Sequence, residues 1–134
     1  MRVYLAIRYH ADQGNRHRIE GISTALEREG IATCCIVRDL ERWGTVRFTP
    51  QDLMQHSFHE IEHSDIVLVD LTEKGVGVGI EAGYAYARKI PVITIAQTGS
   101  EISTTLQGIS HEIVFYKHYE DLFKHIDLMR ALVN

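Results

Sequence analysis

Apolar runs alternate with amphipathic segments along the whole chain, and this alternation limits the possible folds more than any other feature of the sequence. The apolar runs predict strands at residues 2–7, 31–37, 65–71, 90–96 and 112–116. The amphipathic segments predict helices at residues 15–29, 50–63, about 80–89, 102–107 and 119–132. This order predicts a single α/β domain over residues 1–134, Rossmann-like or flavodoxin-like, with about five parallel strands and helices on both faces.

The position of a ligand site follows from this fold class. Ligands of open parallel sheets bind beyond the carboxyl ends of the strands, where the strand order reverses. We therefore expect the site in the loops after the first, third and fourth strands.

Composition narrows the class of protein further. The chain has 134 residues, of which 45% are hydrophobic, and its formal net charge is -4. This charge disfavours broad nucleic-acid binding, which requires a basic face. No stretch approaches the roughly 20 apolar residues of a membrane span, and the two adjacent cysteines, Cys34 and Cys35, are expected to be free thiols in a reducing compartment. We expect a cytoplasmic protein with no membrane or nucleic-acid partner.

The eight histidines do not predict a metal site. His56, His59 and His63 would share one face of the helix at residues 50–63. Zinc sites need three or four converging ligands, and one exposed helix face does not supply them. We expect no metal and no organic cofactor.

The most informative segment is the glycine-rich turn after the third predicted strand. Gly75, Gly77 and Gly79 allow close approach of a ligand, and the helix that follows presents free N–H groups to an anion. Glu81 is predicted in the first turn of this helix, either as a cap or as a carboxylate that the helix dipole keeps ionised and that faces a cleft. The segment lacks the Gly-Lys-Ser/Thr of a P-loop and the G-x-G-x-x-G spacing of a dinucleotide site.

The sequence Gly77 to Gly83, GVGIEAG, resembles the signature of the nucleoside 2-deoxyribosyltransferase superfamily, which includes the 2′-deoxynucleoside 5′-monophosphate N-hydrolases. The resemblance extends along nearly the whole chain. It implies that Glu81 is the nucleophile. It also implies that the glycine turn, Val76 included, contacts the substrate.

Two further segments are similar to substrate-binding parts of these hydrolases. The stretch YLAIR resembles the first strand and a Ser-Ile-Arg that binds the substrate phosphate, which implies contacts from Ala6, Ile7 and Arg8. The stretch ISTTLQG resembles a segment that reaches the phosphate in the site of a neighbouring subunit, which implies roles for Ser103 and Thr104 and a homodimer or a higher homo-oligomer.

The chain departs from the family pattern at three positions. Gly75 replaces a serine or an aspartate that contacts the 5′ end of the substrate, Ser57 replaces an acidic residue near the nucleobase, and Ala6 replaces the serine of Ser-Ile-Arg. These changes fit altered specificity, and they also fit a loss of activity.

The implied chemistry is cleavage of an N-glycosidic bond through an oxocarbenium-like state that a carboxylate traps as a glycosyl ester. A second group should protonate the departing base or donate a hydrogen bond to it, and Asp70 is the residue we expect in this role; its alternative role is to accept a hydrogen bond in the turn before Thr72. Trp43 and Phe48 either stack on the base or fill the edge of the core.

Three functions remain open on this basis. The first is a hydrolase of deoxynucleotides, or a deoxyribosyltransferase that acts on free nucleosides. The second is an inactive nucleotide-binding module. The third, least favoured, is an NAD glycohydrolase of the TIR type.

Overall fold

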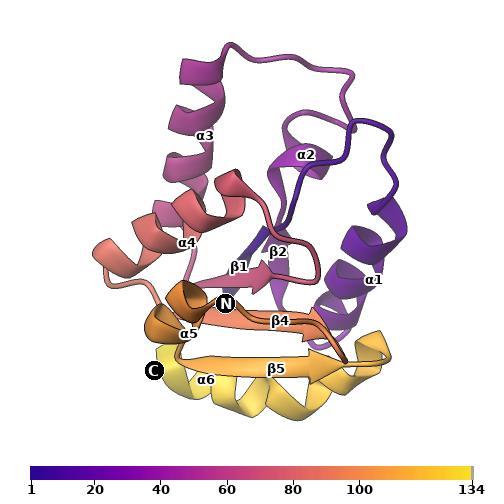
Figure 1. Ribbon diagram of the computed structural model, residues 1–134, viewed down its shortest axis with the longest axis vertical. Coiled ribbons are helices and arrows are strands. Elements are labelled where there is room, and N and C mark those ends of the chain that lie inside the picture. Colours follow the sequence, from indigo (N-terminus) through magenta and orange to yellow (C-terminus); the bar gives the residue numbers. More distant parts are fainter. Residues whose placement is uncertain (134) are drawn as a thin grey trace.

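The computed structural model describes residues 1–133, which form one five-stranded sheet in the order β2-β1-β3-β4-β5 (Figure 1). All four strand pairs are parallel, as predicted. The strands are β1 (Arg2–Ala6), β2 (Ala32–Cys34), β3 (Ile66–Asp70), β4 (Val92–Gln97) and β5 (Glu112–Tyr116). This order is the flavodoxin-like one, and its reversal point lies between β1 and β3.

Helices cover both faces of the sheet. Their bounds are α1 (Arg16–Glu27), α2 (Ile36–Asp39), α3 (Pro50–Glu62), α4 (Val76–Ala87), α5 (Thr104–Ile109), the 3₁₀ helix η1 (Tyr119–His125) and α6 (Ile126–Val133). Helices α1, η1 and α6 bury one core with Val3, Leu5 and Leu68, and helices α3, α4 and α5 bury the other with Val67 and Val69. Because successive residues of β1 and β3 face opposite sides, each strand contributes to both cores.

Local sequence signals explain several helix ends. The Thr49 hydroxyl accepts a hydrogen bond from the Asp52 amide at 3.2 Å, and Pro50 occupies the first helical position of α3, as predicted. The predicted closing helix at residues 119–132 is confirmed as two consecutive pieces, η1 and α6.

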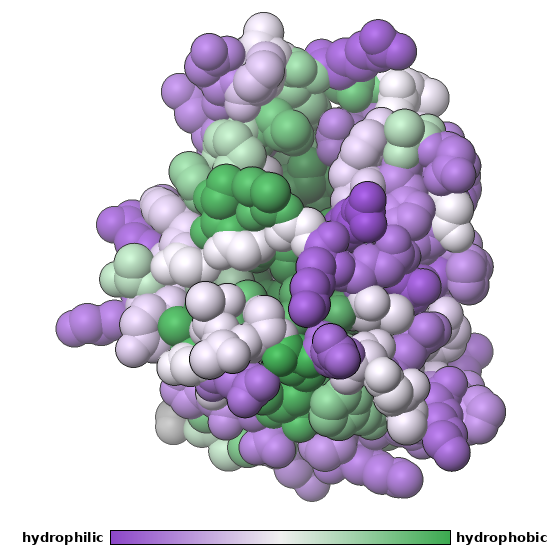
Figure 2. Space-filling model, viewed as in Figure 1, coloured by the Kyte–Doolittle hydropathy of each residue, from purple (hydrophilic) through white to green (hydrophobic). Residues whose placement is uncertain are grey.

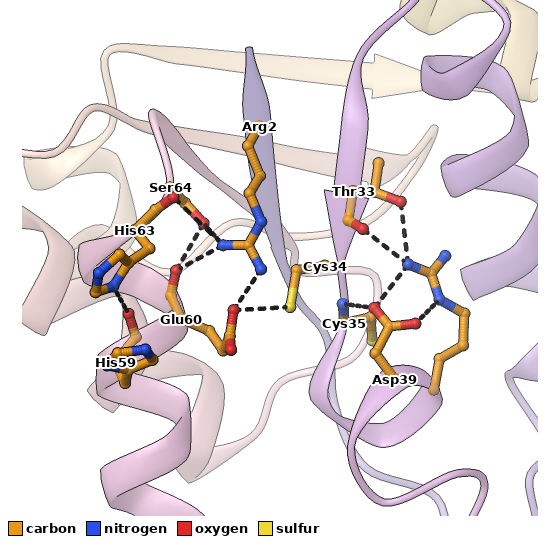
Figure 3. A network of polar contacts seen from close by, with 10 residues as sticks. Arg2, Thr33, Cys34, Cys35, Asp39, His59, Glu60, His63 and Ser64 are labelled. Atoms are coloured by element: carbon orange, nitrogen blue, oxygen red, sulfur yellow. Dashed lines mark hydrogen bonds and ion pairs between the residues drawn. The ribbon is translucent and has the colours of Figure 1, made fainter.

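The second strand is shorter than the predicted run 31–37. The Cys35 amide donates to the Asp39 carboxylate at 2.9 Å, and Arg38 donates to the Thr33 carbonyl at 3.0 Å. These contacts, drawn in Figure 3 beside the network that joins Arg2 of β1 to Glu60 of α3, turn the chain into α2 directly after β2. The prediction of strand at residues 36–37 was therefore wrong.

The glycine turn is also shorter than predicted. Helix α4 begins at Val76, with Gly75 as its extended N-cap residue, so that Gly77 and Gly79 lie inside the helix. Glu81 is consequently the sixth residue of α4 and lies in its second turn, not in its first. No helix in residues 1–133 is long and apolar enough to cross a membrane.

Candidate active site

A cavity of about 510 Å³ opens at the carboxyl ends of β1, β2 and β3. Its walls come from the segments that follow these strands and from residues of α3 and α4. The contributions after the first and third strands match the sequence prediction. The segment after β2 contributes through Ile36, Val37 and Glu41 and not through Trp43 or Phe48, the residues considered from the sequence, and the segment after β4 does not reach this cavity. All lining residues fall between Tyr4 and Glu81.

Glu81 lines this cavity, and its carboxylate is paired with a tyrosine. The Tyr4 hydroxyl donates a hydrogen bond to Glu81 Oε2. Tyr4 comes from β1 and is buried, so the contact joins the sheet to α4. Burial and the nearby carboxylate raise the pKa of Tyr4, which keeps its hydroxyl protonated as the donor.

Burial, opposed by the hydrogen bond from Tyr4, raises the pKa of Glu81 to about 7. Both roles considered from the sequence, a helix cap and a carboxylate that the dipole keeps ionised, require Glu81 in the first turn. The dipole acts within the first turn of a helix, and Glu81 lies beyond it. The structure therefore places at the cavity a carboxyl group that exchanges its proton near neutral pH, a property common in catalytic acids and bases.

The rim of the cavity is positively charged. Arg8 follows β1, Lys74 precedes α4, and both line the cavity. Glu73 lies behind this rim: its carboxylate is 3.6 Å from Arg8, 3.2 Å from Arg18 and 2.8 Å from His10. The N-terminal residues of α4 also line the cavity, so backbone N–H groups accompany the two cations.

The opposite wall is apolar. It is formed by Ile36 and Val37 of α2 and by Leu53 and Met54 of α3. Such a wall suits the faces of a flat heteroaromatic ring, whereas the cationic rim suits an anion. One carboxyl group, that of Glu41, also lines the cavity.

Most of the substrate-binding residues predicted from the sequence meet at this cavity. The structure brings together Glu81 with Ile7, Arg8, Ser57, Gly75, Val76 and Gly77. Gly75 lies beside the Arg8 side chain, whose Cγ is 3.4 Å from the position that a Cβ would take, an ordinary van der Waals distance. Ala6 is buried in the core beneath the cavity.

Asp70 and Trp43 do not line the cavity. Asp70 is 1% exposed; its carboxylate accepts hydrogen bonds from the Tyr116 hydroxyl at 2.6 Å and from the Thr72 amide at 2.8 Å. The structure thus supports its alternative role in the turn. Trp43 packs instead under the guanidinium of Arg16, 4.4 Å from the ring centre.

Ser103 and Gly79 line a separate hollow of about 410 Å³. This hollow shares Lys74, Gly75 and Val76 with the main cavity. Thr104 is exposed at the start of α5. Within one copy of the chain, Ser103 and Thr104 are therefore not part of the main cavity.

The histidines of α3 do not converge on a common point. His56 packs against Phe48, with ring centres 4.7 Å apart, while His63 bonds to the His59 carbonyl at 2.8 Å. Across residues 1–133 no three metal-ligating side chains lie together. Phe48 is thereby placed at the edge of α3, away from the cavity lining.

Known proteins resemble the chain in sequence and in fold, although no protein-family model matches it. A protein of Thermofilum pendens, provisionally named as a 2′-deoxynucleoside 5′-phosphate N-hydrolase, is 25% identical over 96% of this chain and 94% of its own length. The CMP N-glycosidase of Clostridium botulinum has a TM-score of 0.67 and 20% identity, over 96% of this chain and 98% of its own. The 2-deoxyribosyltransferase of Bacillus psychrosaccharolyticus has a TM-score of 0.71 and 16% identity, over 91% of this chain and 90% of its own.

The predicted resemblance to the nucleoside 2-deoxyribosyltransferase superfamily is confirmed. The relatives are named as a 2′-deoxynucleoside 5′-phosphate N-hydrolase, a CMP N-glycosidase and a 2-deoxyribosyltransferase, so the chain resembles N-glycosyl hydrolase-like enzymes.

Sequence reasoning missed several residues that line the cavity, four of which carry a hydroxyl or a charged group. Tyr4, Tyr9, Glu41 and Lys74 were not singled out. One signal was available for Tyr4, whose hydroxyl is the only polar side-chain atom in the run from Val3 to Ala6 and needs a partner when it is buried. Glu41 gave no such signal, because it lies in a stretch that reads as an ordinary loop.

Proposed function

We propose that the protein hydrolyses the N-glycosidic bond of a 2′-deoxynucleoside 5′-monophosphate and releases the base through a glycosyl ester on Glu81. The observation that carries this proposal is the Tyr4–Glu81 pair in a cavity with one cationic and one apolar wall. The apolar wall suits the base, the rim suits the phosphate, and Glu81 lies in the same cavity to meet the sugar.

The arrangement supports attack by one defined oxygen. Tyr4 holds Oε2 of Glu81, which leaves Oε1 as the attacking atom. Gly77 has no side chain there, and a Cβ at this position would lie 4.0 Å from Oε1. Attack on C1′ breaks the bond to the base and forms the ester; water then attacks C1′, gives the free sugar phosphate and returns the carboxylate.

The rim supports recognition of a phosphate. Arg8, Lys74 and the first N–H groups of α4 supply charge and donors for an anion. Glu73 offsets part of the Arg8 charge. Lys74 makes no ion pair or side-chain hydrogen bond within residues 1–133, so its ammonium is free to meet a phosphate.

Base release from a substrate panel tests the proposal. The panel contains deoxynucleosides, deoxynucleoside monophosphates, their ribose counterparts and NAD, each with and without an added acceptor base. We expect free base and sugar phosphate from the deoxynucleoside monophosphates. Formation of a new nucleoside would identify a transferase instead, and tight nucleotide binding without any release would identify a binding module.

Tyr4→Phe is expected to move the pH dependence of base release. The nucleophile must be ionised, so kcat/KM of the wild type should rise with pH through about 7. The hydrogen bond from Tyr4 lowers the pKa of Glu81, so its removal should shift this rise to higher pH. A pH profile of both proteins measures the shift, and an unchanged midpoint would contradict the role of the pair.

We extend the proposal to a homodimer whose subunits complete each other's sites. Helix α4 exposes Val76 (83%), Ile80 (47%) and Tyr86 (56%), and Figure 2 shows apolar surface over this part of the molecule. The hollow that contains Ser103 adjoins this surface. Light scattering should give the mass of a dimer, and Ile80→Glu should give a monomer; a monomeric wild type at working concentration would refute the extension.

A further inference from the structure

The proposed reaction needs a proton donor for the departing base. A base that leaves C1′ without a proton leaves as an anion, which slows the step, and a positioned acid typically contributes about 10²–10⁴-fold. Neither residue considered from the sequence fills this role. The Ser57 hydroxyl donates to the Leu53 carbonyl at 2.9 Å, and Asp70 lies outside the cavity.

We infer that Glu41 is the general acid that protonates the departing base. Its side chain lines the same cavity as Glu81, next to the α2 part of the apolar wall, where the base would lie. The inference rests on the proposed function and adds a residue that the family resemblance does not point to.

The backbone holds Glu41 firmly. Its amide donates to the Ile36 carbonyl at 2.9 Å. Its carbonyl accepts from the amides of Gly44 and Val46, both at 3.0 Å. The residue is therefore fixed at the end of α2, and only its side chain is free to move.

The carboxyl group itself has no partner. Within residues 1–133, no hydrogen bond or ion pair engages the Glu41 side chain, whereas the carboxylates of Glu60, Glu62, Glu73 and Glu81 are all engaged. A half-buried carboxyl group without a partner favours its neutral form, and burial raises the pKa of Glu41. A base packed on the apolar wall would remove further water from the Glu41 carboxyl group.

The other ionisable groups of the cavity are committed elsewhere or unsuited to the task. The proton of Tyr4 is donated to Glu81, and Arg8 and Lys74 lie at the anionic end of the substrate. Burial raises the pKa of the Cys35 thiol to about 12. Tyr9 is exposed at the mouth.

The proton balance closes over one turnover. The Glu41 carboxyl proton moves to a ring nitrogen of the base as the C1′–N bond breaks, and the electrons of that bond leave with the base. In the second step the Glu41 carboxylate accepts a proton from the water that attacks C1′. Both Glu41 and Glu81 then return to their starting states, and one water has been consumed.

Glu41→Gln tests the inference with two matched leaving groups. The first substrate is dGMP, or dCMP if cytosine is the base released. The second is the same nucleotide with a methyl group on a ring nitrogen of the base, which is N7 of guanine or N3 of cytosine. The methylated base carries a fixed positive charge and leaves without an acid. We expect Glu41→Gln to slow the unmodified substrate by about 10²–10⁴-fold and the methylated one by less than about threefold.

The pH profile gives a second readout. Loss of the acid should convert a bell-shaped dependence of kcat/KM into one that rises and then stays level above about pH 7, where Glu81 is ionised. Glu29→Gln, which changes an exposed carboxylate in the turn after α1, is the control and should match the wild type. Thermal unfolding verifies that both variants are folded.

The outcomes separate this inference from the proposed function. Equal slowing of both substrates, or no slowing of either, would overturn the role of Glu41 while base release by the wild type stands. If neither the wild type nor any variant releases base from either substrate, the proposed function itself fails, and the inference fails with it.

Discussion

Glu81→Gln is expected to abolish base release, by a factor on the order of 10³ or more. An amide at this position cannot form the glycosyl ester, and it also loses the charge that stabilises an oxocarbenium-like state. The measurement is chromatography of released base under saturating deoxynucleoside monophosphate. Turnover within tenfold of the wild type would remove Glu81 from the mechanism.

The same variant offers an internal control through its stability. Because the pKa of Glu81 in the folded protein is about 7, above its ordinary value of 4.5, ionisation of this group opposes folding. This loss of folding free energy is absent below about pH 4.5, grows between about pH 4.5 and 7, and is complete above about pH 7. Glu81→Gln removes this loss, so at pH 8 we expect a variant at least as stable as the wild type by denaturant unfolding. Lost activity in such a protein cannot be attributed to unfolding.

Asp70→Ala is expected to have the second largest effect, and on stability instead of chemistry. The substitution leaves the buried Tyr116 hydroxyl and the Thr72 amide without their acceptor. Hydrogen bonds to a charged group contribute about 1.5–3 kcal/mol each, so for these two bonds we expect a loss of about 3–6 kcal/mol in the free energy of unfolding. Chemical denaturation at pH 7.5 measures it.

Asp70→Asn serves as the conservative partner of this variant. The amide oxygen of Asn can still accept one of the two hydrogen bonds, so the loss of stability should be smaller. Both variants should release base within a few-fold of the wild type at temperatures where they are folded. A folded Asp70→Asn protein without turnover would restore Asp70 to the reaction and would contradict its placement outside the cavity.

The alternating pattern was sufficient to predict the fold because the strands of the sheet are mainly apolar and the segments between them are amphipathic. The central strand β3 is buried at every position, and its sequence is apolar until Asp70. The end of β2 was less predictable. Ile36 and Val37 favour a strand, but the Asp39 carboxylate, four residues after Cys35, draws the chain into α2. The spacing of apolar residues along the sequence does not predict such a side-chain contact.

The candidate site was predicted in part for a similar reason. The GVGIEAG motif located Glu81, and the resemblance located Arg8 and Ser57, all of which line the cavity. Motifs do not report which way a side chain turns. Asp70 and Trp43 lie close in sequence to cavity residues, yet their side chains find partners in Tyr116 and Arg16.

The start of α4 shows how one additional helical turn changes the environment of a carboxyl group. A helix that began after the last glycine would have put Glu81 in the first turn, where the dipole favours a permanent charge. The observed start at Val76 moves it one turn inward, beside Tyr4, where burial dominates. Gly77 and Gly79 both lie inside the helix, although glycine is a weak helix former.

The lining of the cavity has one more consequence. Every residue that lines it lies at or before Glu81, so the strands β4 and β5 and the last helices supply none. The first three fifths of the chain hold the groups that line the cavity. The remainder adds β4 and β5 to one edge of the sheet and packs its helices on the two faces. Within one copy of the chain, changes that select a different base can therefore be confined to the first part, and the later part enters a site only through the proposed contact of Ser103 with a neighbouring subunit.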